Sequence, residues 1–211
     1  MVDFSLYLIT DRMQTAGRTL PAVVADALRG GLRAVQLREK DLSAGELFEM
    51  AVELRQLTRE YGAKLLINDR IDIALAVAAD GVHLGKAGLP VMTARRLLGE
   101  ERLIGYSAHS PGEVLQAQHD GADFVTFGPV YQTPSKAQFG APLGVTALAE
   151  AARAVRIPVF ALGGVRHSSV AEVLSAGADG IALISAIMAA PNPTAETESL
   201  LLAIAHHATA C

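Results

Sequence analysis

Short apolar runs alternate with longer amphipathic segments along the whole chain. Most of the apolar runs hold four or five residues and are apolar throughout, which is typical of strands buried on both faces of a parallel sheet. The predicted strands are Leu6–Thr10, Ala34–Leu37, Lys64–Ile67, Gly81–Leu84, Leu103–Tyr106, Phe124–Phe127, Val159–Leu162 and Gly180–Ile184.

The segments between these runs carry helical spacing and helix-start residues. Ser43 with Glu46 three residues later forms a capping box, and Ser110 before Pro111 marks another helix start. The predicted helices are Ser43–Tyr61, Ile71–Ala79, Pro111–Asp120, Leu143–Val155, Ser168–Ala176 and Thr194–Ala208. Eight strand–helix units in 211 residues predict an α/β fold, a single-domain (β/α)8 TIM barrel over residues 1–211 with a helical tail from about 192 to 211. A doubly wound sheet is the alternative.

Related Asp- and Gly-containing turns lead directly into three of the predicted strands. They are Ala79–Gly81, Asp120–Asp123 and Ala176–Gly180. Each turn ends a helix at the end of the barrel associated with stability. We therefore assign these aspartates no chemistry.

Composition narrows the class of protein. The chain is 51% hydrophobic and 19% charged with a net charge of -4, and the absence of a Lys/Arg run argues against a nucleic-acid partner. The apolar runs are too short to span a membrane, and the N-terminus lacks a signal-peptide pattern. The single cysteine, Cys211, permits no intrachain disulfide, which fits the reducing cytoplasm. Homo-oligomerisation is compatible with the sequence.

Polar residues gather where the predicted strands end, which is where (β/α)8 barrels place their active sites. The densest segment is Phe127–Lys136, where Thr133, Ser135 and Lys136 combine two hydroxyls with a cation and so suit a phosphate. The other strand-end residues are Gln36, Arg38, Lys40, Asn68, Asp69, His83, Ser107, His109, Gly163, Gly164, Ile184 and Ser185.

Several of these residues also have a purely structural interpretation. Asn68 and Asp69 could cap the following helix, and Ser185 could cap another. His83 lies within an apolar strand and is more simply a core histidine, and His109 could belong to a turn. The glycine pair could form only a tight turn.

The predicted cluster combines three cations, Arg38, Lys40 and Lys136, with one carboxylate, Asp69. No nucleophilic triad, cysteine nucleophile or dense histidine cluster is apparent. Cations with a carboxylate suit Mg²⁺ and a diphosphate, and such a site acts by stabilising the charge of a leaving group.

The joint pattern of motifs resembles the thiamine phosphate synthase family and its relative, the thiazole tautomerase. The motifs that carry the resemblance are QLREK at 36–40, IND at 67–69, DGVHLG at 80–85, GYSAHS at 105–110, GADFVTFGPVYQTPSK at 121–136, ALGGV at 161–165 and GADGIALISAI at 177–187. The resemblance extends from Leu6 to about Ala190.

The resemblance implies that an aminopyrimidine methyl diphosphate is joined to a thiazole ethyl phosphate, with loss of pyrophosphate first and capture of the pyrimidine-stabilised cation by the thiazole nitrogen. It implies that Asp69 ligates Mg²⁺ and that Lys136, Ser107 and Arg38 are the catalytic residues. By the same resemblance, the pyrimidine diphosphate would be held by Gln36, Arg38, Lys40, Asn68, Ser107 and Lys136, and the thiazole phosphate by Thr133, Ser135, Gly163, Gly164, Ile184 and Ser185.

The chain departs from the synthase pattern at two places: at Lys86 and Gly88, and more mildly at Ser135, where a serine replaces the usual threonine and keeps the hydroxyl. Gly88 stands where synthases carry a second Mg²⁺-ligating aspartate, and Lys86 replaces a glutamine, so Lys86 could neutralise diphosphate in place of that carboxylate. Pro129 stands where tautomerases carry a catalytic histidine, which favours the synthase. A tautomerase-like enzyme and a non-catalytic binder of thiamine-pathway phosphates remain the alternatives.

Overall fold

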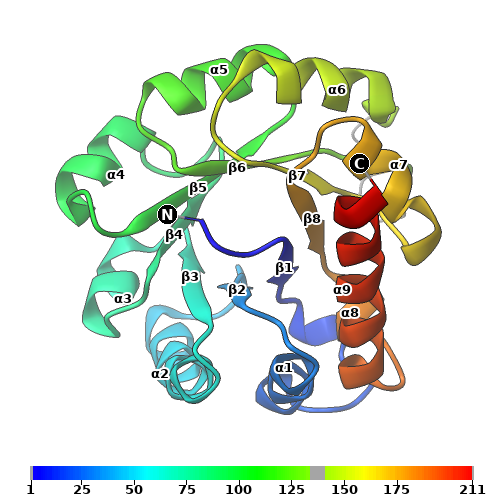
Figure 1. Cartoon of the computed structure of the whole chain (residues 1–211). Helices are drawn as coiled ribbons and strands as arrows, with labels where there is room; N and C mark the ends of the chain where they lie inside the picture. The colour runs from blue at the N-terminus through cyan, green and yellow to red at the C-terminus, as the bar shows by residue number, and fades with distance from the viewer. Residues whose placement is uncertain (1, 134–140, 211) are drawn as a thin grey trace.

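Eight parallel strands close into one barrel in the computed structural model, which describes residues 2–133 and 141–210 (Figure 1). The strands are β1 (Leu6–Ile9), β2 (Ala34–Leu37), β3 (Lys64–Asn68), β4 (Gly81–Leu84), β5 (Leu103–Ala108), β6 (Phe124–Phe127), β7 (Val159–Leu162) and β8 (Gly180–Leu183). Each strand pairs with the next in the sequence, and β8 pairs with β1. The predicted barrel is confirmed, and the doubly wound alternative is wrong.

Helices form a ring around the strands (Figure 1). They are α1 (Leu20–Arg29), α2 (Ala44–Glu60), α3 (Ile71–Ala76), α4 (Val91–Leu98), α5 (Pro111–His119), α6 (Gly144–Ala154), α7 (Val170–Ser175), α8 (Ser185–Met188) and α9 (Pro193–Ala210), with 3-10 turns η1 (Arg12–Gln14) and η3 (His167–Ser169). The predicted capping box is present, because Glu46 and Ser43 each accept a hydrogen bond from the other's backbone N–H. In the described residues no helix has both the length and the apolar character that a membrane crossing requires.

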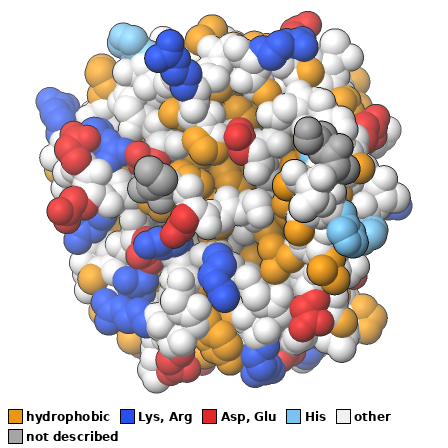
Figure 2. Space-filling model, in the orientation of Figure 1, with side chains coloured by type: hydrophobic (Ala, Val, Ile, Leu, Met, Phe, Trp, Pro, Cys, Tyr) orange, Lys and Arg blue, Asp and Glu red, His pale blue; other side chains and the backbone are white. Residues whose placement is uncertain are grey.

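Aromatic rings fill the barrel at the end where the strands begin. Phe4 packs against Phe124 and Phe160 with ring centroids 5.6 and 5.3 Å away, and the N-terminal segment crosses the middle of the barrel (Figure 1). In the same view, charged side chains of both signs lie mostly toward the rim of the molecule, and hydrophobic ones lie nearer its middle (Figure 2). Phe4 is 9% exposed and fills this opening. The polar residues that follow the strands lie at the opposite end of the barrel, where the parallel strands end.

Three aspartates at the helix-to-strand turns have the same structural role. Asp80, Asp123 and Asp179 each accept a hydrogen bond from the backbone N–H of a residue at or near the start of a neighbouring strand, at 2.9, 2.7 and 2.8 Å. Asp80 also pairs with Arg55, and Asp123 with Arg95. These contacts stabilise the barrel end opposite the candidate site, so the structural interpretation of the three turns is confirmed.

Candidate active site

Three predicted substrate-binding residues point into the barrel near its carboxyl end. Leu66 belongs to the apolar cluster inside the barrel, and side chains two residues apart share a face, so Asn68 points inward as well. The same alternation from Ala34 and Leu103 directs Gln36 and Ser107 inward. The sequence therefore brings these side chains together from β2, β3 and β5. Their roles in binding remain predictions.

Arg38 continues the inward alternation just past the end of β2. Its charge acts on His83 of β4: burial first, and then the nearby Arg38 cation, lower the pKa of His83 to about 3. His83 is therefore unprotonated at neutral pH, although the Arg38 cation lies nearby. Lys40, two residues further along, is exposed.

A chain of polar side chains crosses the barrel interior below the site. The Gln36 side-chain nitrogen donates to the Tyr7 hydroxyl over 3.2 Å, and that hydroxyl lies 3.4 Å from Nδ1 of His83. Nε2 of His83 lies 3.0 Å from the Ser107 hydroxyl and 3.4 Å from that of Thr126. His83 is thus a core histidine with satisfied nitrogens, as its apolar strand predicted.

A buried carboxylate fixes the end of β2. Glu39 is 5% exposed and accepts hydrogen bonds from the Thr10 hydroxyl at 2.7 Å and from the Arg12 backbone at 3.2 Å. Thr10 in turn accepts the backbone N–H of Arg38 at 2.9 Å. Glu39 therefore connects the loop after β1 to the backbone that carries Arg38 and Lys40.

Asp69 lies in the left-handed region with φ +57° at the end of β3. One carboxylate oxygen accepts the Gly85 backbone N–H at 2.9 Å, and the other accepts the Asn68 side-chain amide at 2.9 Å. A Cβ atom at Gly88 would lie 2.5 Å from the Asp69 oxygen that accepts from Gly85. Glycine at position 88 therefore leaves room for the Asp69 carboxylate. Neither Asn68 nor Asp69 caps α3, because the cap position is Arg70 and no side chain bonds there.

The described residues offer Mg²⁺ one carboxylate at this site. They contain no group of three or more His, Cys, Asp or Glu side chains that could hold a metal. Mg²⁺ commonly binds through one or two carboxylates together with substrate phosphates and water. Asp69 with a substrate diphosphate therefore fits the ion, although not as an all-protein cage.

The predicted phosphate-binding side of the site is described only in part. Ser135 and Lys136 lie outside the described residues, and Thr133 is the last residue before them. Gly163 and Gly164 have φ values of +92° and +68°, and a Cβ atom at either would lie within 2.7 Å of Pro129 or Tyr131. The glycines therefore allow the loop after β6 to pack on the β7 turn, and the Tyr131 N–H donates to the Gly163 carbonyl at 2.9 Å.

The two remaining predicted residues lie after β8. Ile184 packs at the edge of the inner apolar cluster. Ser185 is exposed and is the first residue of α8, and its side chain makes no capping hydrogen bond. The capping interpretation of Ser185 is therefore wrong.

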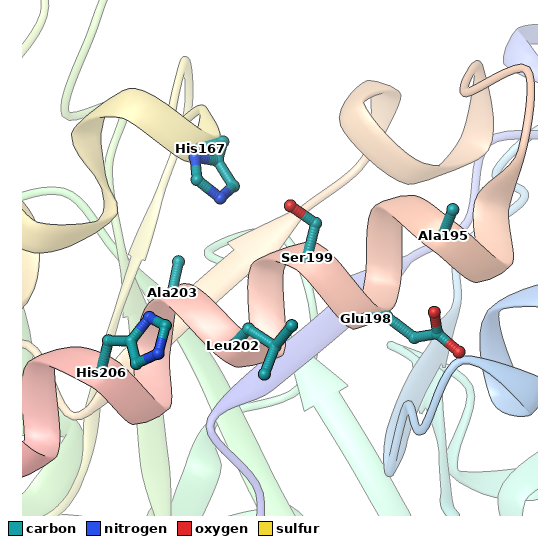
Figure 3. A pocket seen from close by; sticks show the side chains of 7 residues that line it. All are labelled: His167, Ala195, Glu198, Ser199, Leu202, Ala203 and His206. Carbon is teal, nitrogen blue, oxygen red and sulfur yellow. The ribbon is translucent and has the colours of Figure 1, made fainter.

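A groove between η3 and α9 lies apart from the predicted site. Its volume is about 420 Å³, and its lining residues are His167, Ala195, Glu198, Ser199, Leu202, Ala203 and His206. Figure 3 shows His167 and Ser199 pointing toward one another, whereas Glu198 points away. None of the predicted site residues lines this groove.

Sequence reasoning missed Tyr7, Thr126 and Glu39. Tyr7 and Thr126 share the inward-facing alternation of their strands, so counting every second residue of β1 and β6 would have found them. Glu39 gives no such signal, because it follows the strand and its burial depends on the loop after β1.

Comparisons with known proteins agree on one family. The family described as thiamine monophosphate synthase matches residues 6–187. The chain is 59% identical to a putative thiamine-phosphate synthase of Geobacter sulfurreducens over 95% of this chain and 94% of the other. It is 46% identical to the thiamine-phosphate synthase of Chloroflexus aurantiacus over 95% of this chain and 92% of the other. The solved thiamine phosphate pyrophosphorylase from Pyrococcus furiosus superposes with a TM-score of 0.88 at 39% identity and 96% coverage of both chains.

Proposed function

The chain belongs to the thiamine monophosphate synthase family, and from this premise we propose how its residues carry out the reaction. It is a transferase that forms thiamine phosphate and pyrophosphate, as its family and similar proteins indicate. Its partners are small-molecule substrates, a pyrimidine diphosphate and a thiazole phosphate. The inward-facing group of Gln36, Asn68 and Ser107 from three separate strands is the observation that best supports this proposal.

The pyrimidine substrate binds at the carboxyl end of the barrel in this proposal. Gln36 and Asn68 have amide groups that match ring nitrogens and an exocyclic amine. Arg38 and Lys40, which follow β2, bind the diphosphate in this proposal, together with Lys136. Glu39 holds the β2 end through Thr10, so the backbone that carries Arg38 and Lys40 is fixed before substrate binds.

The reaction begins when the bond between the methylene carbon and the diphosphate oxygen breaks. The oxygen keeps the electron pair and leaves as pyrophosphate, and the pyrimidine ring stabilises the cation that remains. The lone pair of the thiazole nitrogen then forms the new carbon–nitrogen bond. The protein accelerates the first step by stabilising negative charge on the leaving group with fixed cations and hydroxyl donors.

Asp69, together with the diphosphate oxygens of the substrate, would hold Mg²⁺. The ion would supply further positive charge at the leaving group. Lys86, exposed on the turn next to Asp69, supplies charge where Gly88 offers no second carboxylate.

The thiazole phosphate binds on the opposite side of the mouth. Thr133 and Ser135 provide hydroxyls, and the Gly163–Gly164 turn and the backbone at Ile184 and Ser185 provide N–H groups. We propose that the enzyme acts in the cytoplasm, where a chain whose only cysteine is terminal needs no disulfide.

The proposal is tested by following both products with purified protein. Thiamine phosphate and pyrophosphate are expected to form in equal amounts when both substrates are present, and neither product when one is omitted. Asn68→Ala is expected to raise the KM for the pyrimidine diphosphate, whereas Gln56→Ala, on the outer face of α2, leaves it unchanged. Isomerisation of a thiazole carboxylate phosphate without thiamine phosphate formation would instead indicate a tautomerase.

A further inference from the structure

We propose that Tyr7 and His83 are positioning residues that orient the Ser107 hydroxyl so that it donates its hydrogen bond to the departing diphosphate. The orientation of the Ser107 hydroxyl is inferred from the hydrogen bonds between Gln36, Tyr7, His83 and Ser107. That a diphosphate accepts from this hydroxyl rests on the proposed function.

The direction of these hydrogen bonds is set by Gln36, the first side chain in the series from Gln36 through Tyr7 and His83 to Ser107. The Gln36 side-chain nitrogen can only donate, so the Tyr7 oxygen accepts from it at 3.2 Å. The Tyr7 hydrogen is then available to Nδ1 of His83, 3.4 Å away. Because Tyr7 is 0% exposed, its hydrogen needs an acceptor, and among the described contacts of the hydroxyl only Nδ1 can serve as one. Nδ1 therefore accepts, and the single hydrogen of the neutral imidazole lies on Nε2.

Nε2 then acts as a donor toward β5 and β6. It lies 3.0 Å from the Ser107 oxygen and 3.4 Å from the Thr126 oxygen, so Ser107 is the nearer acceptor. A serine hydroxyl has one hydrogen and two acceptor lone pairs. Because Ser107 accepts from His83, its own hydrogen points away from the imidazole and remains available to a ligand.

The opposite direction would work against an anionic ligand. If Nδ1 carried the hydrogen, Nε2 would accept, and Ser107 would give its hydrogen to His83. Ser107 would then present only lone pairs to a diphosphate, which is an acceptor itself. The direction set by Gln36 is thus the one that suits the proposed reaction.

The three side chains have little freedom to rearrange. Tyr7 is 0% exposed, and Gln36 and His83 are each 1% exposed. The His83 ring packs 5.7 Å from the Tyr7 ring and 5.7 Å from the Phe124 ring. Gly105 lies opposite His83 on β5, and a Cβ atom at that position would overlap both His83 and Phe124. Gly105 of β5 thus leaves space for the His83 ring, and Tyr7 of β1 packs against it.

Nitrogen NMR of histidine-labelled protein tests the hydrogen position without any enzymatic assay. The His83 signals are assigned by their loss in His83→Gln or by through-bond correlations in the wild type. The expected spectrum has the hydrogen on Nε2 and an unprotonated Nδ1 at neutral pH. A hydrogen on Nδ1, or a protonated ring at pH 7, would overturn the inference even if the protein is a synthase.

A double-mutant cycle tests whether Tyr7 acts through Ser107. Tyr7→Phe is expected to lower kcat about five- to tenfold, and Ser107→Ala about 100-fold. The double variant should lose no more than Ser107→Ala alone, because the Tyr7 effect needs the serine hydroxyl. Tyr106→Phe is the matched control, because Tyr106 lies next to Ser107 on β5 but faces away from the barrel interior. Its kcat should equal that of the wild type.

The outcomes separate this inference from the proposed function. Losses that multiply in the double variant would show that Tyr7 acts independently of Ser107, which refutes the positioning role. Wild-type protein that forms no thiamine phosphate would refute the proposed function, and the NMR result would still decide the hydrogen position. A loss in Tyr7→Phe confined to the melting temperature, with kcat unchanged, would also refute the inference.

Discussion

Replacing Gly88 with alanine should destabilise the protein through Asp69. The φ of Gly88 is outside the left-handed region, so the backbone itself accepts a side chain. The new Cβ atom would lie 2.5 Å from an Asp69 oxygen, and that oxygen must leave the Gly85 N–H to which it is bound at 2.9 Å. Losing one hydrogen bond to a charged group costs about 2 kcal/mol.

This cost corresponds to a measurable change in the melting temperature. For a domain of this size, about 2 kcal/mol lowers the midpoint of thermal unfolding by about 4–8 °C. Gly88→Asp carries the same Cβ atom and is expected to melt at a similarly reduced temperature without metal. A Gly88→Ala protein that melts like the wild type would refute the role assigned to the Asp69–Gly85 contact.

Mg²⁺ distinguishes the two variants, because only one gains a second carboxylate. Ligand binding to the folded state raises the melting temperature, and the rise is larger the more the ligand concentration exceeds its Kd. Gly88→Asp should therefore gain more stability from added Mg²⁺ and inorganic pyrophosphate than Gly88→Ala does, and should form product at lower Mg²⁺ concentration. Equal responses in the two variants would show that the ion binds away from Asp69.

Three further predictions concern other parts of the site. Lys136→Ala should lower kcat by about 100-fold or more in a pyrophosphate-release assay, because a cation at the leaving group is lost, and a wild-type rate would remove Lys136 from the site. Glu39→Gln should lower the free energy of unfolding, measured in urea, by about 2 kcal/mol, because the buried carboxylate accepts from Thr10 and Arg12. Asp41→Asn is the control: Asp41 forms an exposed pair with Arg12, so its replacement should change the free energy by less than about 1 kcal/mol. The third prediction concerns pH, because burial lowers the pKa of His83 from 6.5 to about 3 in the folded protein. Between these two values the unfolded chain binds a proton on His83 that the folded protein does not, so the free energy of unfolding falls as the pH decreases below about 6.5. Between pH 6.5 and 4.5 the wild type should lose about 2–3 kcal/mol more than His83→Gln, and parallel pH profiles would contradict the lowered pKa.

The sequence predicted the barrel well because each strand is short, apolar and followed by helix-forming residues. It also singled out Gln36, Asn68 and Ser107, because polar side chains at the ends of buried strands are conspicuous among apolar neighbours; the structure directs all three into the barrel, and their roles in binding stay predictions. It placed the end of β5 at Tyr106, whereas the strand continues to Ala108 and includes Ser107. Pairing with β6 extends the strand past its polar residue, and no local pattern reveals such pairing.

The polar interior of the barrel was harder to predict. Tyr7 lies in a run that is apolar on both sides, and its hydroxyl gains importance only because Gln36 and His83 come from other strands. Burial of Glu39 likewise depends on Arg12 and Thr10 from a distant segment. The hydrogen bonds of Tyr7 and the burial of Glu39 therefore depend on tertiary contacts rather than on local pattern. The helices α1, α4 and α8 were given no predicted range, although α1 has local helix signals, an N-cap at Thr19 and buried residues at helical spacing.

The most direct test of the proposed function is pyrophosphate release by the wild-type protein, measured with both substrates and with either one alone, with and without Mg²⁺. We expect release that is accompanied by an equal amount of thiamine phosphate, needs both substrates and increases with Mg²⁺. Folded protein that binds the pyrimidine diphosphate but releases no pyrophosphate under any of these conditions would show that it is not a thiamine phosphate synthase.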